Sequence, residues 1–315
     1  MTFLEEYIKN KGGIMSGELA NFLCSHEGIT EEAARKRVER LKSPIHKITR
    51  IFSENQSFVY HSDNYNSQSY FRSLEEAFKT SGKRCYAILK AINYHHGIIL
   101  KKELANYSFS PVDRILGHKL YETLIQELEQ NKVIISLDED HFRLAPSLSD
   151  RVSLNQRHFK AIRFSKKLIL EQFSIWCRNI GLVSYEQSGF NSQIGGFQFA
   201  YSGPSYLTGL VEYRNGLPQP GFIAADILIG NKTNNEAIDF FLQKIAIISR
   251  SNPTVKLLPV LIVDGTDASA FSKLKAKGVM VASISEIFGQ SYVELLKSLI
   301  NTITNAGAIL KKEPE

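Results

Sequence analysis

Positive charge is concentrated in one short stretch near the N-terminus. Residues 33–50 read AARKRVERLKSPIHKITR and contain seven lysines and arginines but a single acid, Glu39. A cluster of this kind can bind the phosphates of a nucleic acid, or it can form a solvated surface that binds nothing. The elements that carry these residues decide between the two. The seven are Arg35, Lys36, Arg37, Arg40, Lys42, Lys47 and Arg50.

A second basic stretch, RHFKAIRFSKK, occupies residues 157–167 and carries five lysines and arginines. If it is helical, Lys160, Arg163 and Lys167 lie on one side of the helix. Phe159 and Phe164 are expected to be buried on the other side. The basic side then either contacts phosphates or is solvated, and the sequence does not choose between these alternatives.

Other kinds of chemistry have little support in the sequence. It contains no GxxxxGK[ST] or GxGxxG motif after a strand, which excludes the common nucleotide-binding loops, and no GxSxG motif. Cys24, Cys85 and Cys177 stand alone, so neither a disulfide framework nor a zinc site is predicted, and a reducing cytoplasm is expected. No apolar run is long enough for a membrane span. The net charge of +6 permits nucleic acid as a partner.

The chain contains an internal repeat. GGIMSGELANF at residues 12–22 aligns without a gap with GIILKKELANY at residues 97–107. Both copies have the same predicted order: a helix ended by glycine, a short helix, a longer helix and a β-hairpin. Ser16 is predicted to cap the short helix of the first copy. Leu19 and Leu104 are expected to be buried at equivalent positions.

This order resembles the winged helix-turn-helix class, over residues 1–66 for the first copy and 67–148 for the second. The resemblance rests on element order and not on a diagnostic motif. In winged helices the third helix and the wing face DNA. The resemblance therefore implies that the seven basic residues, expected on a helix at 31–42 and on the first wing strand, contact double-stranded DNA.

The second copy differs from the first in charge. Its longer helix, HKLYETLIQELEQN at residues 118–131, carries one lysine and three glutamates, and its wing tip at residues 138–140 reads DED. Phosphates would be repelled there. The second copy is therefore interpreted as a spacer or as the contact for a protein partner, with a second DNA-reading unit as the alternative.

Strands and helices alternate from residue 157 onward. A helix is predicted at 159–181, strands at 182–187, 195–202, 206–213 and 221–230, a helix at 234–251, and then a strand, a short helix, a strand and a final helix at 291–304. Parallel strands are expected near the end. This order resembles the restriction-endonuclease-like fold of the PD-(D/E)XK superfamily, over residues 157–304. The expected fold is thus multi-domain α/β, with two winged helices, a mixed-sheet domain and a tail at 305–315.

An active member of that superfamily needs an Asp near the end of its second strand and an acid-x-Lys motif on its third. The carboxylates hold Mg²⁺, and the lysine stabilises the attacking water. Here the third strand supplies Asp226 without that lysine. The substitute set is Glu212 and Asp226 as metal ligands with Lys232, and Glu171 on the first helix. The favoured alternative is that Asp226 forms a cap or a salt bridge while Glu212 is solvated.

The sequence therefore predicts a cytoplasmic DNA-binding protein of the restriction or phage-defence kind, whose nuclease-like domain is degenerate and needs no cofactor. The first alternative is an active Mg²⁺-dependent endonuclease. The second is an interaction scaffold that uses the second copy to recruit an effector. No membrane partner is expected, and a homodimer remains open.

Overall fold

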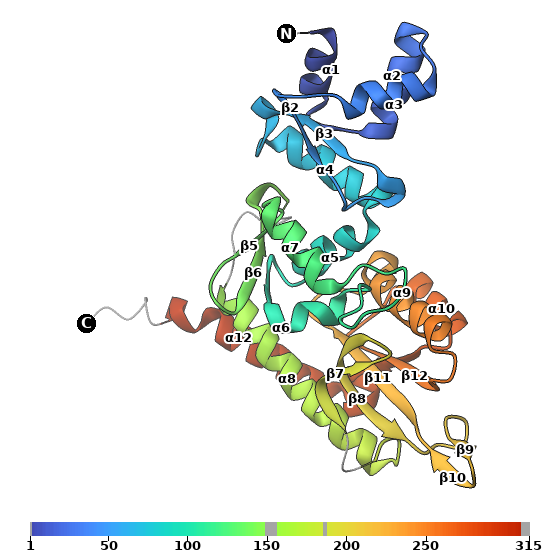
Figure 1. Ribbon diagram of the computed structural model, residues 1–315. Coiled ribbons are helices and arrows are strands. Elements are labelled where there is room, and N and C mark those ends of the chain that lie inside the picture. Colours follow the sequence, from blue (N-terminus) through green and yellow to red (C-terminus); the bar gives the residue numbers. More distant parts are fainter. Residues whose placement is uncertain (1, 149–155, 185–187, 310–315) are drawn as a thin grey trace.

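The computed structural model describes residues 2–148, 156–184 and 188–309, and it shows a mixed α/β protein (Figure 1). Figure 1 places an N-terminal unit at one end, a second unit in the middle and a large sheet with its helices at the other end. None of the helices in the described part of the chain combines the length and the apolar character needed to cross a bilayer.

The first unit contains three helices and a three-stranded antiparallel sheet of order β1-β3-β2. Thr2 forms a capping box with Glu5 at the start of the first helix, and Thr30 caps the third. Ser16 is the first residue of the second helix and not its cap, because its hydroxyl accepts a hydrogen bond from Ser57 N instead. The elements are α1 (Phe3–Lys11), β1 (Ile14–Met15), α2 (Ser16–Glu27), α3 (Glu31–Glu39), β2 (Ile45–Ile48), η1 (Ser53–Asn55), β3 (Phe58–His61) and η2 (Ser62–Asn64).

The second unit repeats the element order and the sheet order of the first. Its antiparallel sheet has the order β4-β6-β5. Leu19 and Leu104 are both fully buried, which confirms the burial expected from the repeat. The elements are α5 (Lys83–Tyr94), β4 (Ile98–Leu100), α6 (Lys101–Leu104), η3 (Ala105–Tyr107), α7 (Tyr121–Gln130), β5 (Ile134–Ser136), β6 (His141–Leu144) and η4 (Pro146–Leu148).

One helix between the two units, α4 (Gln68–Ser81), has no counterpart in the first unit. Its aromatic side chains Tyr70, Phe71 and Phe78 are buried in a core that reaches into both units. The connection between the two repeats is therefore a packed helix and not a loose linker.

The large sheet has five strands in the order β13-β12-β11-β8-β7. β11, β12 and β13 are parallel, as expected for the end of the chain, and β8 runs antiparallel to both of its neighbours. The elements are α8 (Gln156–Asn179), β7 (Gly189–Ile194), β8 (Phe197–Ser205), β9 (Glu212–Arg214), β10 (Leu217–Gln219), β11 (Gly221–Leu228), α9 (Asn235–Ser251), β12 (Leu257–Val263), α10 (Ala268–Ala276), β13 (Met280–Ser283), α11 (Ile284–Phe288) and α12 (Gln290–Ile309).

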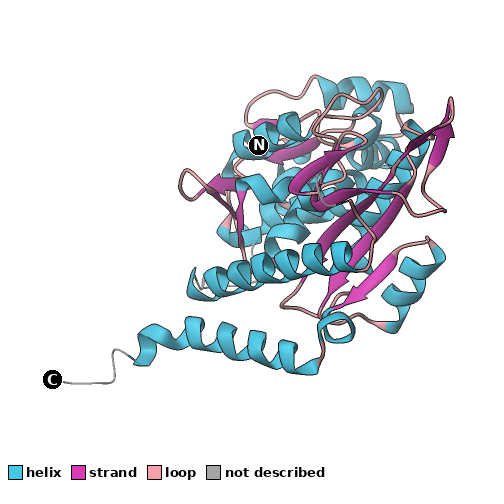
Figure 2. Cartoon of the chain, turned by 90° about the horizontal axis from the view of Figure 1, so that it is seen from below, coloured by secondary structure: helices cyan, strands magenta, loops and turns pink. Residues whose placement is uncertain are grey.

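Helices cover both faces of this sheet. α8 and α12 lie side by side on one face (Figure 2), and α9, α10 and the second unit cover the other. On β11 the side chains alternate accordingly: Ile223 and Ala225 pack toward α8, whereas Ala224 and Leu228 pack toward α9. A strand buried on both faces is apolar almost throughout, which explains the sequence GFIAADIL.

Two of the expected strands are placed differently. Residues 182–184 are not a strand, and the rest of that expected strand, 185–187, lies outside the described residues. The first strand of the sheet is β7 instead. Residues 206–211 are irregular with a turn at 208–210, and only the end of the expected strand enters β9, which pairs with β10 in a separate hairpin. The strand beside β11 in the sheet is therefore β8.

The second unit and the sheet share one hydrophobic core. The buried cluster that contains Leu104 and Leu128 of the second unit also contains Phe199, Phe241 and Leu261 of the sheet and its helix. Leu19 belongs to a separate, smaller cluster within the first unit. The second unit is thus a structural part of the sheet layer.

Candidate functional site

The two central strands of the sheet separate before β11 ends. β8 pairs with β11 as far as Tyr201 and Ala225. At the next residue of β11, Asp226 Oδ1 accepts a hydrogen bond from Ala200 N at 2.9 Å. A side chain thus replaces the strand backbone as the partner of this N–H group. Polar side chains from the second unit, α8 and α9 fill the opening.

Asp226 and Lys244 form a fully buried ion pair in this opening, with Oδ2 and Nζ 2.6 Å apart. Lys244 Nζ also donates to the carbonyls of Asn106 at 2.6 Å and Gln198 at 2.9 Å, so all three of its N–H donors have acceptors. Burial raises the pKa of Asp226 and lowers the pKa of Lys244, and each partner opposes the shift of the other. Through these bonds the pair connects β11 and α9 with β8 and η3. Its role is therefore structural.

Lys166 on α8 forms a second buried polar group beside the first. Its Nζ donates to Tyr107 Oη at 2.7 Å and to His95 Nε2. The Tyr107 hydroxyl donates to the carbonyl of Ile227 at 3.0 Å. His95 Nδ1 lies 2.6 Å from the carbonyl of Ala91, so this nitrogen carries the proton and Nε2 is the acceptor. Burial, and next the charge of Lys166, lower the pKa of His95 well below its usual value.

The buried position of Lys166 predicts a pH dependence of stability. Burial lowers its pKa to about 8, from 10.5 in the unfolded chain. Between these values the unfolded chain binds more protons than the folded one, so stability attributable to Lys166 rises as the pH rises through this window. Urea unfolding at several pH values should show that the free energy of unfolding of the wild type rises through this window more steeply than that of Lys166→Met. Parallel curves for the two proteins would contradict it.

A cleft of about 440 Å³ opens beside α8, and we name it the α8 cleft. Its walls come from α8, α6, η3 and the strands β7, β8 and β11. Five cationic side chains line it, against the two acids Glu103 and Glu171. The cleft therefore favours an anionic ligand. The five cations are Lys102, Lys160, Arg163, Lys166 and Lys167.

Three of these cations are available to a ligand. Lys167 lies 3.8 Å from Glu171, and Lys166 belongs to the buried group. The side chains of Lys102, Lys160 and Arg163 have no acidic partner among the described residues. Their side chains are exposed, which keeps them accessible.

The structure brings Lys160, Arg163 and Lys167 to one cleft, in agreement with their spacing on the predicted helix. The sequence did not point to Lys102, because it reaches this cleft from the second unit through tertiary packing. Lys166 was also missed, since nothing local indicated that the lysine before Lys167 would be buried.

Phe164 is 47% exposed and lines the cleft, so the expectation that it is buried was wrong. Phe159 is buried as expected. The helix buries the side of Ile162 against the sheet. Phe164 follows two residues later, which places it about 200° around the helix, on the opposite side.

The proposed metal and catalytic set, Glu212, Asp226 and Lys232, is not brought together. Glu212 lies on the β9–β10 hairpin, where its carboxylate is 3.4 Å from Lys256 Nζ. Lys232 follows the opposite end of β11 and lies 3.0 Å from Asp267. Asp226 is buried between them and paired with Lys244. No group of three metal-ligating side chains occurs anywhere in the described residues.

The basic residues of α3 are exposed, but each has an acidic neighbour. Such surface pairs contribute little stability, so a phosphate can replace the acid at small cost. α3 ends at Glu39 and not at residue 42. The pairs are Arg35–Glu31, Lys36–Glu32 and Arg37–Glu27.

The remaining four basic residues of this stretch lie on different elements. Arg40 is the residue directly after α3, and Lys42 lies two residues further on; both are exposed. Lys47 on β2 donates to the carbonyl of Glu39 at 2.7 Å. The carbonyl of Arg50 accepts a hydrogen bond from Lys119 of the second unit. The seven residues are therefore spread over α3, β2 and the segments that follow them.

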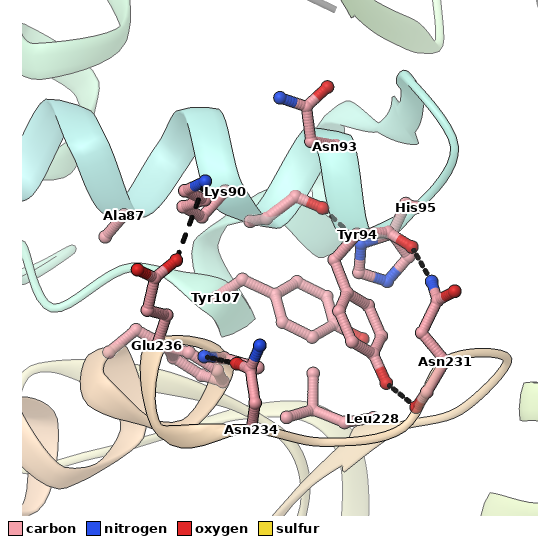
Figure 3. Close-up of a pocket in the computed structure, with 13 residues that line it drawn as sticks. Ala87, Lys90, Asn93, Tyr94, His95, Tyr107, Leu228, Asn231, Asn234 and Glu236 are labelled. Carbon is pink, nitrogen blue, oxygen red and sulfur yellow. Dashed lines mark hydrogen bonds and ion pairs between the residues drawn. The ribbon is translucent and has the colours of Figure 1, made fainter. Parts of the chain in front are cut away.

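A second cavity, of about 270 Å³, lies between α5 and α9 (Figure 3). Its polar groups mostly join the second unit to the sheet layer. Tyr94 Oη donates to the carbonyl of Asn231 at 2.8 Å, and Asn231 Nδ2 donates back to the carbonyl of Tyr94 at 3.0 Å. At the rim, Lys90 lies 3.6 Å from Glu236. These contacts tie the second unit to the loop after β11.

Comparison with known proteins identifies no family. No family model matches the chain, and no curated protein matches it. Among solved structures, the crystal structure of protein VC1899 from Vibrio cholerae aligns over 76% of this chain and 57% of that one, with 8% identity and a TM-score of 0.25. A TM-score this low does not establish a common fold.

Proposed function

We propose that this protein binds double-stranded DNA without cutting it, with the exposed cations at the rim of the α8 cleft as the principal contact and α3 as a second. The observation that carries this proposal is the α8 cleft, with five cations against two acids. Three of the five, Lys102, Lys160 and Arg163, have no acidic partner among the described side chains. Cations that are exposed and unpaired beside one cleft are suited to phosphate contacts.

Two features of the fold support the family relationships behind this function. Sheets of order β1-β3-β2 and β4-β6-β5, each following its helices, support two winged helix units. A helix followed by β7, β8 and β11, with β12 and β13 parallel to β11, supports a restriction-endonuclease-like domain. In that assignment the β9–β10 hairpin is an insertion before the third strand.

The positions of the acids favour binding over cleavage. Metal-dependent cleavage needs two carboxylates on one metal ion. The side of β11 that faces α8 presents only Ile223, Ala225 and Ile227. Asp226 lies on the other side, fully buried with Lys244. The described strands thus offer the α8 cleft no carboxylate. The two acids that line it, Glu103 and Glu171, come from α6 and α8 and belong to no group of three metal-ligating side chains in the described residues.

The packing of the acidic second unit within the chain accounts for its presence without an external protein partner. Its apolar side is packed against the chain's own sheet layer, and Tyr107 reaches the carbonyl of Ile227 on β11. We interpret the unit as a spacer that also forms one wall of the α8 cleft through Lys102. The scaffold alternative has no specific observation in its favour.

The test of this proposal is DNA affinity as a function of salt. Lys160→Ala/Arg163→Ala/Lys167→Ala should weaken binding of a blunt duplex in fluorescence anisotropy. The slope of log affinity against log salt should fall by about 0.9 for each lost phosphate contact. Arg35→Ala/Lys36→Ala/Arg37→Ala should have a smaller effect in the same direction, because acids already neutralise these residues.

A matched control is Lys273→Ala/Lys275→Ala/Lys277→Ala, at exposed lysines on and just after α10, across the sheet from α8. It removes the same charge and should leave affinity and slope nearly unchanged. Equal losses of DNA affinity in this control and in the α8 variant would show nonspecific attraction and refute the assigned surface.

The second half of the proposal is that the protein does not cut DNA. Plasmid incubated with the wild-type protein should remain intact with Mg²⁺ or Mn²⁺. Metal-dependent cleavage of the plasmid by the wild type would instead favour the endonuclease alternative.

A further inference from the structure

Two exposed aromatic rings lie on the walls of the α8 cleft. Phe164 on α8 is 47% exposed, and Phe190 on β7 is 48% exposed. One exposed phenylalanine alone is unremarkable on a protein surface. Two beside three unpaired cations form the combination of aromatic and basic side chains that binds unpaired nucleotides.

β7 is locally irregular beside Phe190. Phe190 pairs with Tyr201 and Ser192 pairs with Phe199, with no change of register across Asn191. Asn191 itself has a φ of 48°, in the left-handed region. Both Phe190 and Asn191 are exposed. The ring of Phe190 is supported by that of Tyr201, at 5.7 Å between centroids.

The same irregularity presents a hydrogen-bond donor. Asn106 Nδ2 donates to Asn191 Oδ1 at 3.0 Å, which orients the Asn191 amide. Asn191 Nδ2 has no partner among the described residues. It is therefore available to the edge of a base that lies on Phe190.

The cations are spaced for a short nucleic-acid segment. Lys160 and Lys167 are separated by seven residues of α8, which is roughly 10 Å along the helix axis. Phe164 lies between them in the sequence. A cleft of about 440 Å³ has the size of a small-ligand pocket, so a duplex cannot enter it and contacts only the exposed cations at its rim. In a duplex the base faces are stacked on one another and offer nothing to a phenylalanine ring.

We propose that the α8 cleft binds unpaired nucleotides of DNA, with bases stacked on Phe164 and Phe190 and phosphates on Lys160 and Arg163. This inference rests on the proposed DNA binding and specifies what this cleft takes. The duplex part of the same DNA then lies outside the cleft, where Lys102 and the basic residues of the first unit are the available basic groups. The preferred ligand is a duplex that ends in a single strand.

The test compares a blunt duplex with the same duplex extended by a short thymidine tail, in anisotropy at fixed salt. The wild type should bind the tailed duplex about tenfold more tightly for each stacked base. Phe164→Ala/Phe190→Ala should lose this preference and keep the affinity for the blunt duplex. Because both rings are exposed, the variant should fold normally. Phe164→Tyr/Phe190→Tyr should retain the preference, since a tyrosine ring also stacks.

Two controls separate stacking from charge. A tail of abasic residues keeps the phosphates but has no bases, and the wild type should bind it little better than the blunt duplex. Phe271→Ala removes an exposed phenylalanine on α10 and should change nothing. Equal affinity of the wild type for tailed and blunt duplexes would overturn this inference while leaving duplex binding in place. Absence of binding to either DNA would overturn both proposals, and a preference for an RNA tail over the DNA tail would overturn the assignment to DNA.

Discussion

Replacement of Lys244 by methionine is expected to lower the free energy of unfolding by roughly 3–5 kcal/mol. The substitution leaves the carboxylate of Asp226 buried without its cation, and it removes the donor to the carbonyls of Asn106 and Gln198. An unpaired charge in a dry site is far more costly than the pair itself. Urea unfolding followed by the fluorescence of Trp176, the only tryptophan, measures the loss.

The double variant Asp226→Leu/Lys244→Met should be more stable than Lys244→Met alone, because removing both charges removes the desolvation cost. Lys273→Met is the matched control. Lys273 pairs with Asp239 at 2.7 Å on the surface, and its loss should cost less than about 1 kcal/mol. Wild-type stability of Lys244→Met would refute the structural role of the pair.

Truncation of Leu104 to alanine should cost roughly 2–5 kcal/mol of unfolding free energy. Leu104 is fully buried in the core that the second unit shares with the sheet. Loss of its side chain should therefore destabilise both the second unit and the sheet layer. Leu19→Ala should cost a similar amount but act locally, since its cluster is confined to the first unit. Hydrogen exchange should then show lost protection over α1–α3 for Leu19→Ala, and over α5 and α9 for Leu104→Ala.

Leu116→Ala is the control for this series, because Leu116 is 93% exposed. It should change stability by less than about 0.5 kcal/mol. Loss of protection in the sheet layer upon Leu19→Ala would contradict the separation of the two cores.

Sequence patterns located the features that depend on neighbours along the chain. The repeat predicted that Leu19 and Leu104 are both buried, because the helical period alone decides which side chains share the apolar side of a short helix. The same period placed Lys160, Arg163 and Lys167 together. The strands that alternate with helices near the end of the chain indicated parallel pairing.

The same patterns failed where local signals were ambiguous. The run at residues 206–213 has apolar residues typical of a strand, yet it is mostly irregular and leads into an exposed hairpin. Phe164 lies on the exposed side of the helix, because its aromatic character alone does not decide which side of a helix faces the core. Its helical phase relative to Ile162 indicates the exposed side.

Tertiary structure alone decided which polar groups meet. Asp226 and Lys244 are 18 residues apart and lie on a strand and a helix, so no spacing rule joins them. Lys102 joins α8 across the cleft only because the second unit packs against the sheet. Helical and strand periods follow from backbone geometry and can be read along the chain. The partner of a buried charge, and the wall opposite a basic helix, depend on how separate elements pack, which a sequence pattern does not record.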